Sequence, residues 1–143
     1  MNKILRKEQF SENVFLFEIE APLIAKSRKA GNFIIIRVDK NGERIPLTIA
    51  DADVNKGTIT IVVQRVGLSS QKLCGLNEGD VIADVVGPLG NPTHIENLGT
   101  VVCAGGGVGV APDASDNQGF ESSGKPRSVC YRRQKQRPHN IRG

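Results

Sequence analysis

The feature that most limits how this chain folds is an abrupt change in composition after residue 112. Of the 55 hydrophobic residues, 49 lie in residues 1–112 and only 6 in residues 113–143. Residues 113–143 also hold 7 lysines and arginines against 3 acidic residues, whereas the first 112 residues hold 12 of each. Low apolar content with an excess of one charge is typical of chains that form no core. We therefore expect a core within residues 1–112 and a basic, disordered tail over 113–143.

Length and cysteine content exclude several protein classes. A chain of 143 residues has room for one full domain and too little for two. No apolar run approaches the roughly 20 residues that span a bilayer, and the charged first residues do not fit a signal peptide. The three cysteines, Cys74, Cys103 and Cys130, are widely spaced and form no Cys-x-x-Cys pair. We therefore expect a cytoplasmic protein with no disulfide framework, no metal site and no membrane partner.

The hydrophobic pattern of residues 1–97 predicts a small antiparallel β-barrel. Short runs of β-branched and aromatic residues alternate with turn residues, which is typical of such barrels. Asn41-Gly42 is a strong hairpin signal, and Pro46 implies that its strand is interrupted or lies at an edge there. A short helix is expected over residues 70–76. The expected strands cover residues 14–19, 33–38, 44–49, 58–66 and 80–86.

A glycine-rich loop follows the predicted barrel. Residues 100–104 are short and almost wholly apolar, like a strand covered on both faces. A buried strand that runs into glycines is how a nucleotide-binding α/β domain begins, so residues 98–112 are expected to start such a domain. The spacing gives no clean G-x-G-x-x-G motif, so a phosphate loop and a plain turn both stay open. No helical periodicity follows, and we expect this α/β domain to be incomplete.

The order of these motifs resembles the ferredoxin–NADP(H) reductase superfamily. The motifs are Arg44-Ile45-Pro46-Leu47-Thr48 in the barrel, Gly87-Pro88-Leu89-Gly90 after it, and Gly105-Gly106-Gly107-Val108-Gly109 after the apolar strand. The resemblance extends over residues 1–112. Within the superfamily it is greatest to the group that contains the small subunit of NADH-dependent ferredoxin:NADP oxidoreductase, with the electron-transfer subunit of dihydroorotate dehydrogenase as a near relative.

The resemblance implies that the barrel binds FAD. Arg44 would contact the FAD pyrophosphate, and Pro46, Leu47 and Thr48 would line the isoalloxazine. A second FAD segment would contain Gly67, Ser69 and Ser70, and Gln64 would contact the flavin. From the residues alone, other interpretations stay open: an exposed strand Arg44, a packed Thr48, a solvated Gln64 and serines that only cap a helix. We interpret residues 87–92 as a turn that shapes the site.

The resemblance also implies partners for the flavin. The NAD(P)H pyrophosphate would lie against the glycine loop, formed by Gly105, Gly106, Gly107, Val108 and Gly109. In the family, hydride passes from NAD(P)H to FAD, and electrons then leave singly to a [2Fe–2S] centre, whose cysteines are absent from this chain. A larger oxidoreductase subunit and ferredoxin are the expected partners. No catalytic side chain is assigned, and the truncated chain is expected to bind FAD without oxidising NAD(P)H at a family-like rate.

Two alternatives account for the basic tail. The chain could be a non-catalytic small β-barrel binding module for a protein or RNA partner; however, the charged run at residues 132–137 has only Tyr131 as an aromatic neighbour, which favours a solvated tail over nucleic-acid binding. The tail could also be a shifted reading frame. Read one base later, residues 113–127 can encode an amphipathic helix and residues 131–142 a strand. One extra base near the Pro112 codon would explain the composition change.

Overall fold

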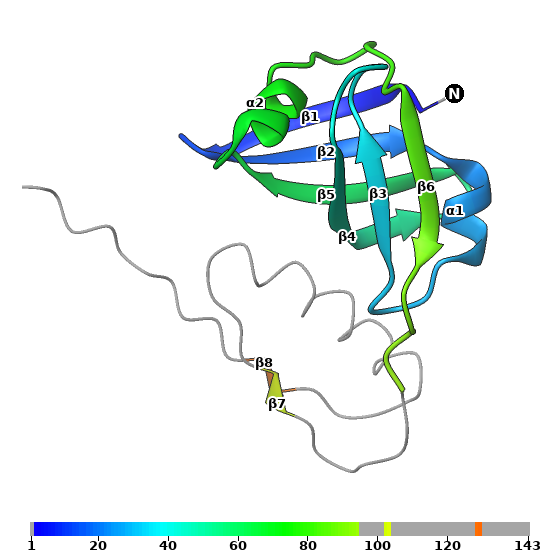
Figure 1. The fold of residues 1–143 in the computed structure, drawn as a ribbon. Helices are drawn as coiled ribbons and strands as arrows, with labels where there is room; N and C mark the ends of the chain where they lie inside the picture. Colours follow the sequence, from blue (N-terminus) through cyan, green and yellow to red (C-terminus); the bar gives the residue numbers. More distant parts are fainter. Residues whose placement is uncertain (1, 95–101, 104–127, 130–143) are drawn as a thin grey trace, which may run out of the picture.

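A computed structural model describes residues 2–94, 102–103 and 128–129 (Figure 1). Within residues 2–94, six strands form one antiparallel sheet in the order β1-β2-β5-β4-β3-β6. Their bounds are Ile4–Ser11 for β1, Val14–Glu20 for β2, Phe33–Arg37 for β3, Arg44–Asp53 for β4, Thr58–Gln64 for β5 and Asp84–Leu89 for β6. The mainly β, antiparallel class that the alternating pattern predicts is therefore confirmed.

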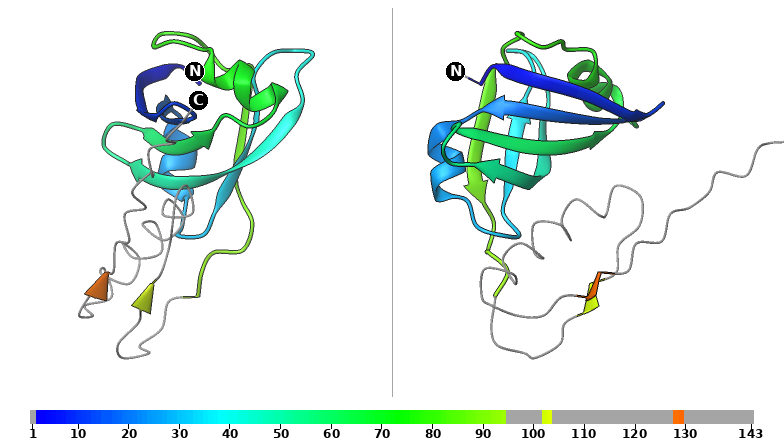
Figure 2. Two further views of the ribbon diagram at one scale, coloured as in Figure 1. Left: turned by 90° about the vertical axis from the view of Figure 1, so that its left-hand side faces the viewer. Right: turned by 180° about the vertical axis from the view of Figure 1, so that it is seen from behind.

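The two edges of this sheet meet, so the sheet closes on itself. Lys3, next to β1, forms an antiparallel bridge with Val81, which precedes β6. Two backbone hydrogen bonds support the bridge: the N–H of Ile4 donates to Asp80 O at 2.9 Å, and the N–H of Ile82 donates to Asn2 O at 3.0 Å. In Figures 1 and 2, β3 and β6 run across the direction of β1, β2 and β5. Closure removes the open edges that an isolated sheet would expose.

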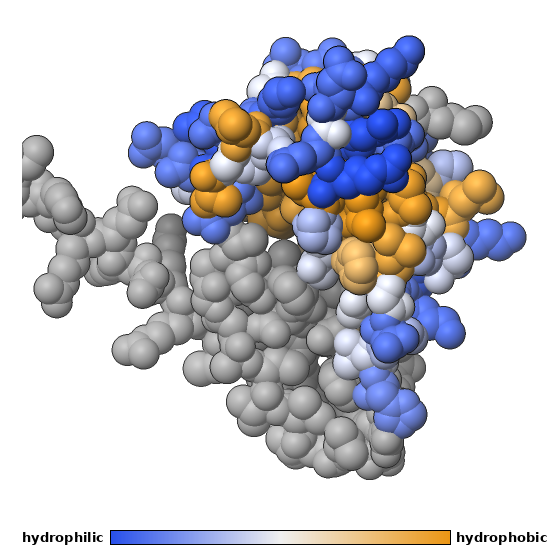
Figure 3. Space-filling model, in the orientation of Figure 1, coloured by the Kyte–Doolittle hydropathy of each residue, from blue (hydrophilic) through white to orange (hydrophobic). Residues whose placement is uncertain are grey.

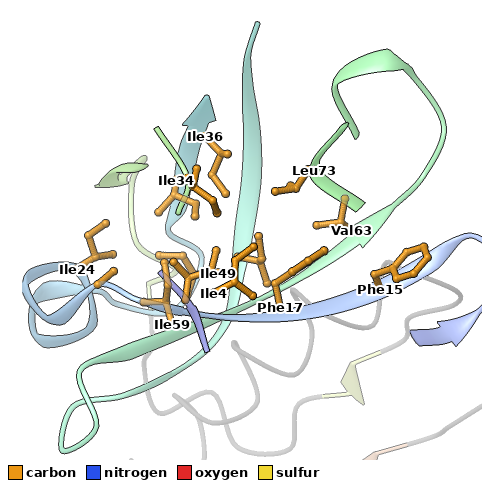
Figure 4. Close-up of a cluster of buried hydrophobic side chains, with 14 of the residues drawn as sticks. Ile4, Phe15, Phe17, Ile24, Ile34, Ile36, Ile49, Ile59, Val63 and Leu73 are labelled. Atoms are coloured by element: carbon orange, nitrogen blue, oxygen red, sulfur yellow. The ribbon is translucent and has the colours of Figure 1, made fainter. Parts of the chain in front are cut away.

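The core lies inside the barrel and consists mostly of isoleucine. The strands alternate between buried and partly exposed residues, as in β2 and β5, because successive side chains point to opposite faces. Phe17, Ile19, Ile34, Ile49 and Ile61 are all 0% exposed. Figure 4 shows Phe17, Ile34 and Ile49 converging from different strands, with Leu73 of the second helix in the same cluster.

Strand β4 bends between two halves of the barrel. Over Arg44–Thr48 it pairs with β3, and Pro46 lies opposite Ile35. Pairing with β5 begins at Ile49, opposite Ile61, and continues to Asp53. Pro46, which has no N–H to donate, therefore lies in a stretch paired on one side only. The expectation of a local edge at this proline is confirmed, although β4 as a whole lies inside the sheet.

Two short helices cover opposite ends of the barrel (Figures 1 and 2). Helix α1, Pro22–Ser27, follows β2 and begins at a proline, whose fixed φ suits the first helical position. Helix α2, Leu68–Cys74, follows β5 and buries Leu73 and Cys74. Neither helix has the length and apolar character needed to cross a membrane, and the described residues contain no other helix.

The largest differences from the expected elements are in β1, α1, α2, β4 and β6. Strand β4 continues to Asp53 rather than ending at residue 49. Strand β1 and helix α1 were not predicted, because β1 is highly charged and α1 has only 6 residues. Helix α2 begins at Leu68 rather than at residue 70. Gly67 is its N-cap residue, and Ser70 lies in its first turn, where its hydroxyl accepts the N–H groups of Val66 and Gly67. Strand β6 begins at Asp84 rather than at residue 80. It runs through Leu89, so the first half of the turn expected over residues 87–92 is wrong: Leu89 pairs with Phe33 of β3, and Gly87 and Pro88 lie at a register shift within β6.

Beyond residue 94 the structure describes two short strands. Strand β7, Val102–Cys103, falls within the apolar strand expected over residues 100–104, and it pairs in parallel with β8, Ser128–Val129. The glycine loop and the remainder of the basic tail lie outside the described residues, as does the predicted shift of reading frame.

Candidate functional site

The first half of β4 presents its predicted site residues on two different faces. Ile45 and Leu47 pack partly against the core cluster, so the strand alternation turns Arg44, Pro46 and Thr48 outward. The Arg44 side chain is 57% exposed, Pro46 is exposed and Thr48 is half-buried. The outer face of β4 therefore offers a cation, a ring and a hydroxyl in a row, while Leu47 supports them from below.

One backbone edge of this stretch has no strand beside it. The N–H of Ile49 donates to Asn32 O, on the β3 side, at 3.2 Å. Successive N–H groups of a strand point to opposite neighbours, so the N–H of Thr48 points away from β3. The ladder with β5 begins only at Ile49, and no β5 residue is registered opposite Thr48. Thr48 is therefore placed to offer both its amide and its hydroxyl to a ligand.

The second predicted segment forms a tight loop before α2. The Ser70 hydroxyl accepts the N–H groups of Val66 and Gly67 at 3.0 and 2.9 Å, and it donates to Gly67 O at 2.9 Å. The single proton of the Ser70 hydroxyl is used in the bond to Gly67 O, so this side chain orders the loop. A Cβ placed on Gly67 would meet nothing within 4 Å, so the space beside this glycine is open to a ligand.

Two polar contacts hold this loop against the hairpin between β3 and β4. The Ser69 hydroxyl donates to Glu43 Oε2 at 2.8 Å, and Lys72 Nζ donates to Asp39 Oδ2 at 3.2 Å. The bond from Lys72 holds the pKa of the Asp39 carboxyl below its usual value of 3.8. Because Glu43 directly precedes Arg44, these contacts bring the Arg44 stretch and the Gly67 loop together from distant parts of the sequence.

Charged residues border the outer face near Arg44. Arg37 of β3 lies between Arg44 of β4 and Asp84 of β6 in the strand register. Asp84 Oδ2 contacts the guanidinium of Arg37 and lies 3.6 Å from that of Arg44. Two cations and one carboxylate leave this row with one net positive charge, which suits an anionic ligand. Figure 3 shows hydrophilic side chains over the ends of β3 and β6 here, and hydrophobic ones beyond them.

Apolar side chains flank the loop itself. Val66 is 75% exposed and Leu68 is 80% exposed, on either side of Gly67. Gln64, exposed at the end of β5, pairs with Val14 and lies beyond the last residue that pairs with β4. Exposed apolar groups beside hydrogen-bond donors are typical of sites for ring-containing ligands.

The sequence predictions missed three residues of this arrangement: Arg37, Glu43 and Asp84. The Asn41-Gly42 turn gave a partial signal for Arg37: a two-residue turn centred there would place Arg37 across from Pro46, whereas the observed register places it across from Arg44. Asp84 carried no comparable signal, since its position depends on the register of β6. The predicted loop of Gly105, Gly106, Gly107, Val108 and Gly109 lies outside the described residues. Over residues 2–94 no cluster of three or more His, Cys, Asp or Glu is placed to hold a metal ion.

The fold is that of the flavin-binding barrels of oxidoreductases. The family described as "Oxidoreductase FAD-binding domain" matches residues 2–94, and the chain belongs to that family. The chain is 48% identical, over 111 residues, to the "Dihydroorotate dehydrogenase B (NAD(+)), electron transfer subunit homolog" of Thermotoga maritima, a match that covers 78% of this chain and 39% of the relative. It is 52% identical over 119 residues to an "Uncharacterized protein in adh 3'region" of Clostridium beijerinckii, covering 78% of this chain and 40% of that protein.

Solved structures give the same assignment of fold. A structure of the NADH-dependent reduced ferredoxin-NADP oxidoreductase superposes with a TM-score of 0.86 at 42% identity, over 90% of this chain and 46% of that chain. Phthalate dioxygenase reductase superposes with a TM-score of 0.73 at 24% identity, over 89% of this chain and 40% of the other, which shows the shared fold alone. The chain spans about 40% of the length of the curated relatives it matches.

Proposed function

We propose that residues 2–94 bind FAD, and that the chain acts as the flavin-carrying part of an electron-transfer subunit. The observation that carries the proposal is the juxtaposition of two segments: the outward row of Arg44, Pro46 and Thr48, and the open loop at Gly67. The Ser69–Glu43 bond of 2.8 Å and the Lys72–Asp39 bond of 3.2 Å hold them side by side, and the second bond remains when Ser69 turns to the ligand. Membership of a family described as an FAD-binding domain supports the same ligand.

The diphosphate of FAD is proposed to lie between Arg44 and the Gly67 loop. A guanidinium is always charged, and its planar fork matches phosphate oxygens. Gly67 lets the ligand approach the backbone, because a side chain there would occupy the open space. Ser69 supplies a hydroxyl at this position by releasing Glu43. Ser70 keeps the loop closed through its hydroxyl, and its backbone N–H remains the group it offers to phosphate.

The isoalloxazine is proposed to lie along β4 towards Thr48. Pro46 gives a flat apolar surface, and Leu47 holds the strand from the core side. Thr48 would donate from its N–H or hydroxyl to the polar edge of the ring, since its amide points away from β3. Gln64 would contact the flavin from the end of β5. The exposed side chains of Val66 and Leu68 would exclude water from the ligand.

Bound FAD supplies two-electron acceptance from a reduced pyridine nucleotide and release of single electrons. The chain's residues bind and orient it, and Arg44 holds positive charge beside it. NAD(P)H is proposed to bind at the loop of Gly105, Gly106, Gly107, Val108 and Gly109. A [2Fe–2S] centre, a larger subunit and ferredoxin are proposed as further partners, since relatives are described as an electron transfer subunit and as a ferredoxin-NADP oxidoreductase.

Titration with FAD tests the proposal directly. The apo chain is expected to quench flavin fluorescence with a stoichiometry of about one FAD per chain, with FMN binding more weakly because it lacks the second phosphate and adenosine. RNA serves as the competing ligand for the binding-module alternative. Stoichiometric RNA binding with a steep salt dependence, together with no FAD binding, would refute the proposal.

The variant Arg44→Ala separates the diphosphate site from nonspecific flavin binding. It should weaken FAD binding by about 1.5 kcal/mol, the lower end for a hydrogen bond to a charged group, because the side chain is 57% exposed. Arg6→Ala is the matched control, since Arg6 lies on β1 and its side chain is 59% exposed. Equal affinities in the two variants would show that Arg44 has no part in binding.

A further inference from the structure

We propose that Arg37 is a positioning residue: it neutralises Asp84 and so leaves Arg44 available to the FAD diphosphate. This inference rests on the proposed function. Arg37 occupies the centre of the three-strand row, with Asp84 registered opposite it on β6 and Arg44 opposite it on β4. In antiparallel pairs, Cβ atoms that face each other lie ~4.5–5.5 Å apart. Both neighbours are therefore within reach of the Arg37 side chain.

The two arginines share one carboxylate oxygen unequally. Arg37 Nη2 is the closer partner of Asp84 Oδ2, and Arg44 Nη2 lies 3.6 Å from the same atom. Arg37 is also the less exposed of the two, at 28% against 57%. Its Nη1 donates to Lys40 O at 3.3 Å, which fixes its orientation from the hairpin side. The negative charge of Asp84 is therefore neutralised mainly by Arg37, and Arg44 makes only a weak contact with it.

This division of roles leaves Arg44 as the cation that a ligand can recruit. Moving Arg44 to a phosphate breaks one long contact, and Asp84 keeps its nearer partner. Without Arg37, Asp84 would have Arg44 as its remaining cation in the row and would hold it as a full ion pair. Arg44 would then bind the diphosphate only by leaving a carboxylate uncompensated, which costs free energy. Arg37 thus supports FAD binding without touching FAD.

The arrangement also explains why like charges face each other across β3 and β4. Two arginines directly opposite one another destabilise a strand pair. Asp84, on the far side of Arg37, offsets this repulsion. A structural role in the fold alone would make the effects of Arg37 and Asp84 substitutions add. The positioning role predicts instead that the second substitution reverses the first.

The experiment measures FAD affinity by flavin fluorescence for the full chain and its variants at one fixed ionic strength. Arg37→Gln is expected to weaken FAD binding about five- to tenfold. Asp84 then pairs with Arg44, and the charge-assisted hydrogen bond from this partly exposed arginine to the phosphate is lost. Arg37→Lys, which keeps a cation beside Asp84, should remain within about twofold of the unaltered chain. The double variant Arg37→Gln/Asp84→Asn should also return to within about twofold, because no carboxylate then competes for Arg44.

Two further variants, Lys40→Gln and Arg44→Ala, separate the inference from simpler explanations. Lys40→Gln removes one positive charge from the same hairpin without removing a side chain that contacts Asp84. It should change FAD affinity by no more than about twofold. Unaltered affinity in Arg37→Gln, or a double variant as weak as the single one, would overturn the positioning role; the second result would place Arg37 in direct contact with FAD. If Arg44→Ala leaves FAD affinity unchanged, the proposed FAD site is refuted as well. If Arg44→Ala weakens FAD binding and Arg37→Gln does not, only the positioning role of Arg37 is refuted.

Discussion

At the scale of single residues, the candidate site depends on which polar groups are already paired within the chain and which groups and spaces remain for a ligand. Ser70 uses its hydroxyl to close the loop before α2, and Arg37 takes up most of the charge of Asp84. Gly67 keeps an open space beside the backbone, and Thr48 keeps an amide without a partner strand. The residues proposed to bind FAD are thus held in place by neighbours that satisfy the competing polar groups.

Gly67 allows ligand approach to be separated from folding. Its φ of −139° suits any residue, and an added Cβ meets nothing within 4 Å. Gly67→Ala should therefore change the free energy of unfolding by less than about 1 kcal/mol, yet weaken FAD binding, because the methyl group fills space proposed for the diphosphate. Gly75→Ala, at the other end of α2, is the matched control. FAD affinity that is equal in the two variants would contradict the placement of the ligand beside Gly67.

Much of this site could be predicted from residues alone, and the remainder could not for a physical reason. Arg44, Thr48 and Gly67 stand in short local patterns, so their sequence neighbourhood carries the signal. Glu43, Arg37 and Asp84 gain their roles through contacts across strands and loops, at sequence separations of 26 residues for Ser69–Glu43 and more for Asp84. Such contacts are set by the register of the sheet, which local sequence determines only weakly.

At the scale of elements, α2 is the part that joins the two halves of the site. Its C-terminal end is held by Lys7 of β1, whose Nζ donates to Cys74 O at 2.6 Å and Leu76 O at 2.8 Å. The same ammonium lies 5.3 Å from the Phe15 ring centroid. Its N-terminal end contacts Glu43 through Ser69. The helix therefore connects the β1 side of the barrel to the β3–β4 hairpin.

Lys7→Met tests how much this attachment contributes to stability. The variant keeps an apolar chain over the phenyl rings but leaves two half-buried carbonyls without their cationic donor. We expect a loss of about 1–3 kcal/mol in the free energy of unfolding, measured by urea denaturation. Lys26→Met, an exposed position on α1, should change it by less than about 0.5 kcal/mol. Equal effects at the two positions would show that Lys7 does not anchor α2.

The Lys72–Asp39 pair gives this element a pH dependence. Because the hydrogen bond from Lys72 lowers the pKa of Asp39 from 3.8 in the folded chain, the pair stabilises the fold above that value. The contribution is lost as pH falls through the folded-state pKa. Asp39→Asn should therefore be less stable than the unaltered chain near pH 7, with the difference disappearing on acidification. A difference that persists unchanged at about pH 2 would rule out this assignment.

The strands were more predictable than the connections between them. Runs of β-branched and aromatic residues in β2, β3 and β5 indicate these strands directly. Strand β1 carries four charged or amide side chains among its eight residues, Arg6, Lys7, Glu8 and Gln9, and pairs with one neighbour in the sheet, so its pattern is obscured. Gly87 and Pro88 are typical of a turn, yet they lie within β6, at a register shift between residues that pair with β3 on either side. Tertiary contacts decide such segments against their local preference.

At the scale of the whole molecule, the closed barrel is a rigid support for the site. A continuous core fixes the strands that carry Arg37, Arg44 and Asp84, and the two short helices lie at opposite ends (Figures 1 and 4). Sites built on strands hold their geometry better than sites built on loops alone. FAD binding should therefore need little rearrangement beyond the side chains of Arg44 and Ser69.

Amide hydrogen–deuterium exchange with and without FAD tests the central claim most directly, because it locates the ligand on the barrel. FAD should slow exchange at residues 44–48 and 66–70, which lie apart in the sequence and together in the fold. Helix α1, at the opposite end, should show no change. Protection confined to α1 or to the β4–β5 turn, or no protection at saturating FAD, would contradict the account.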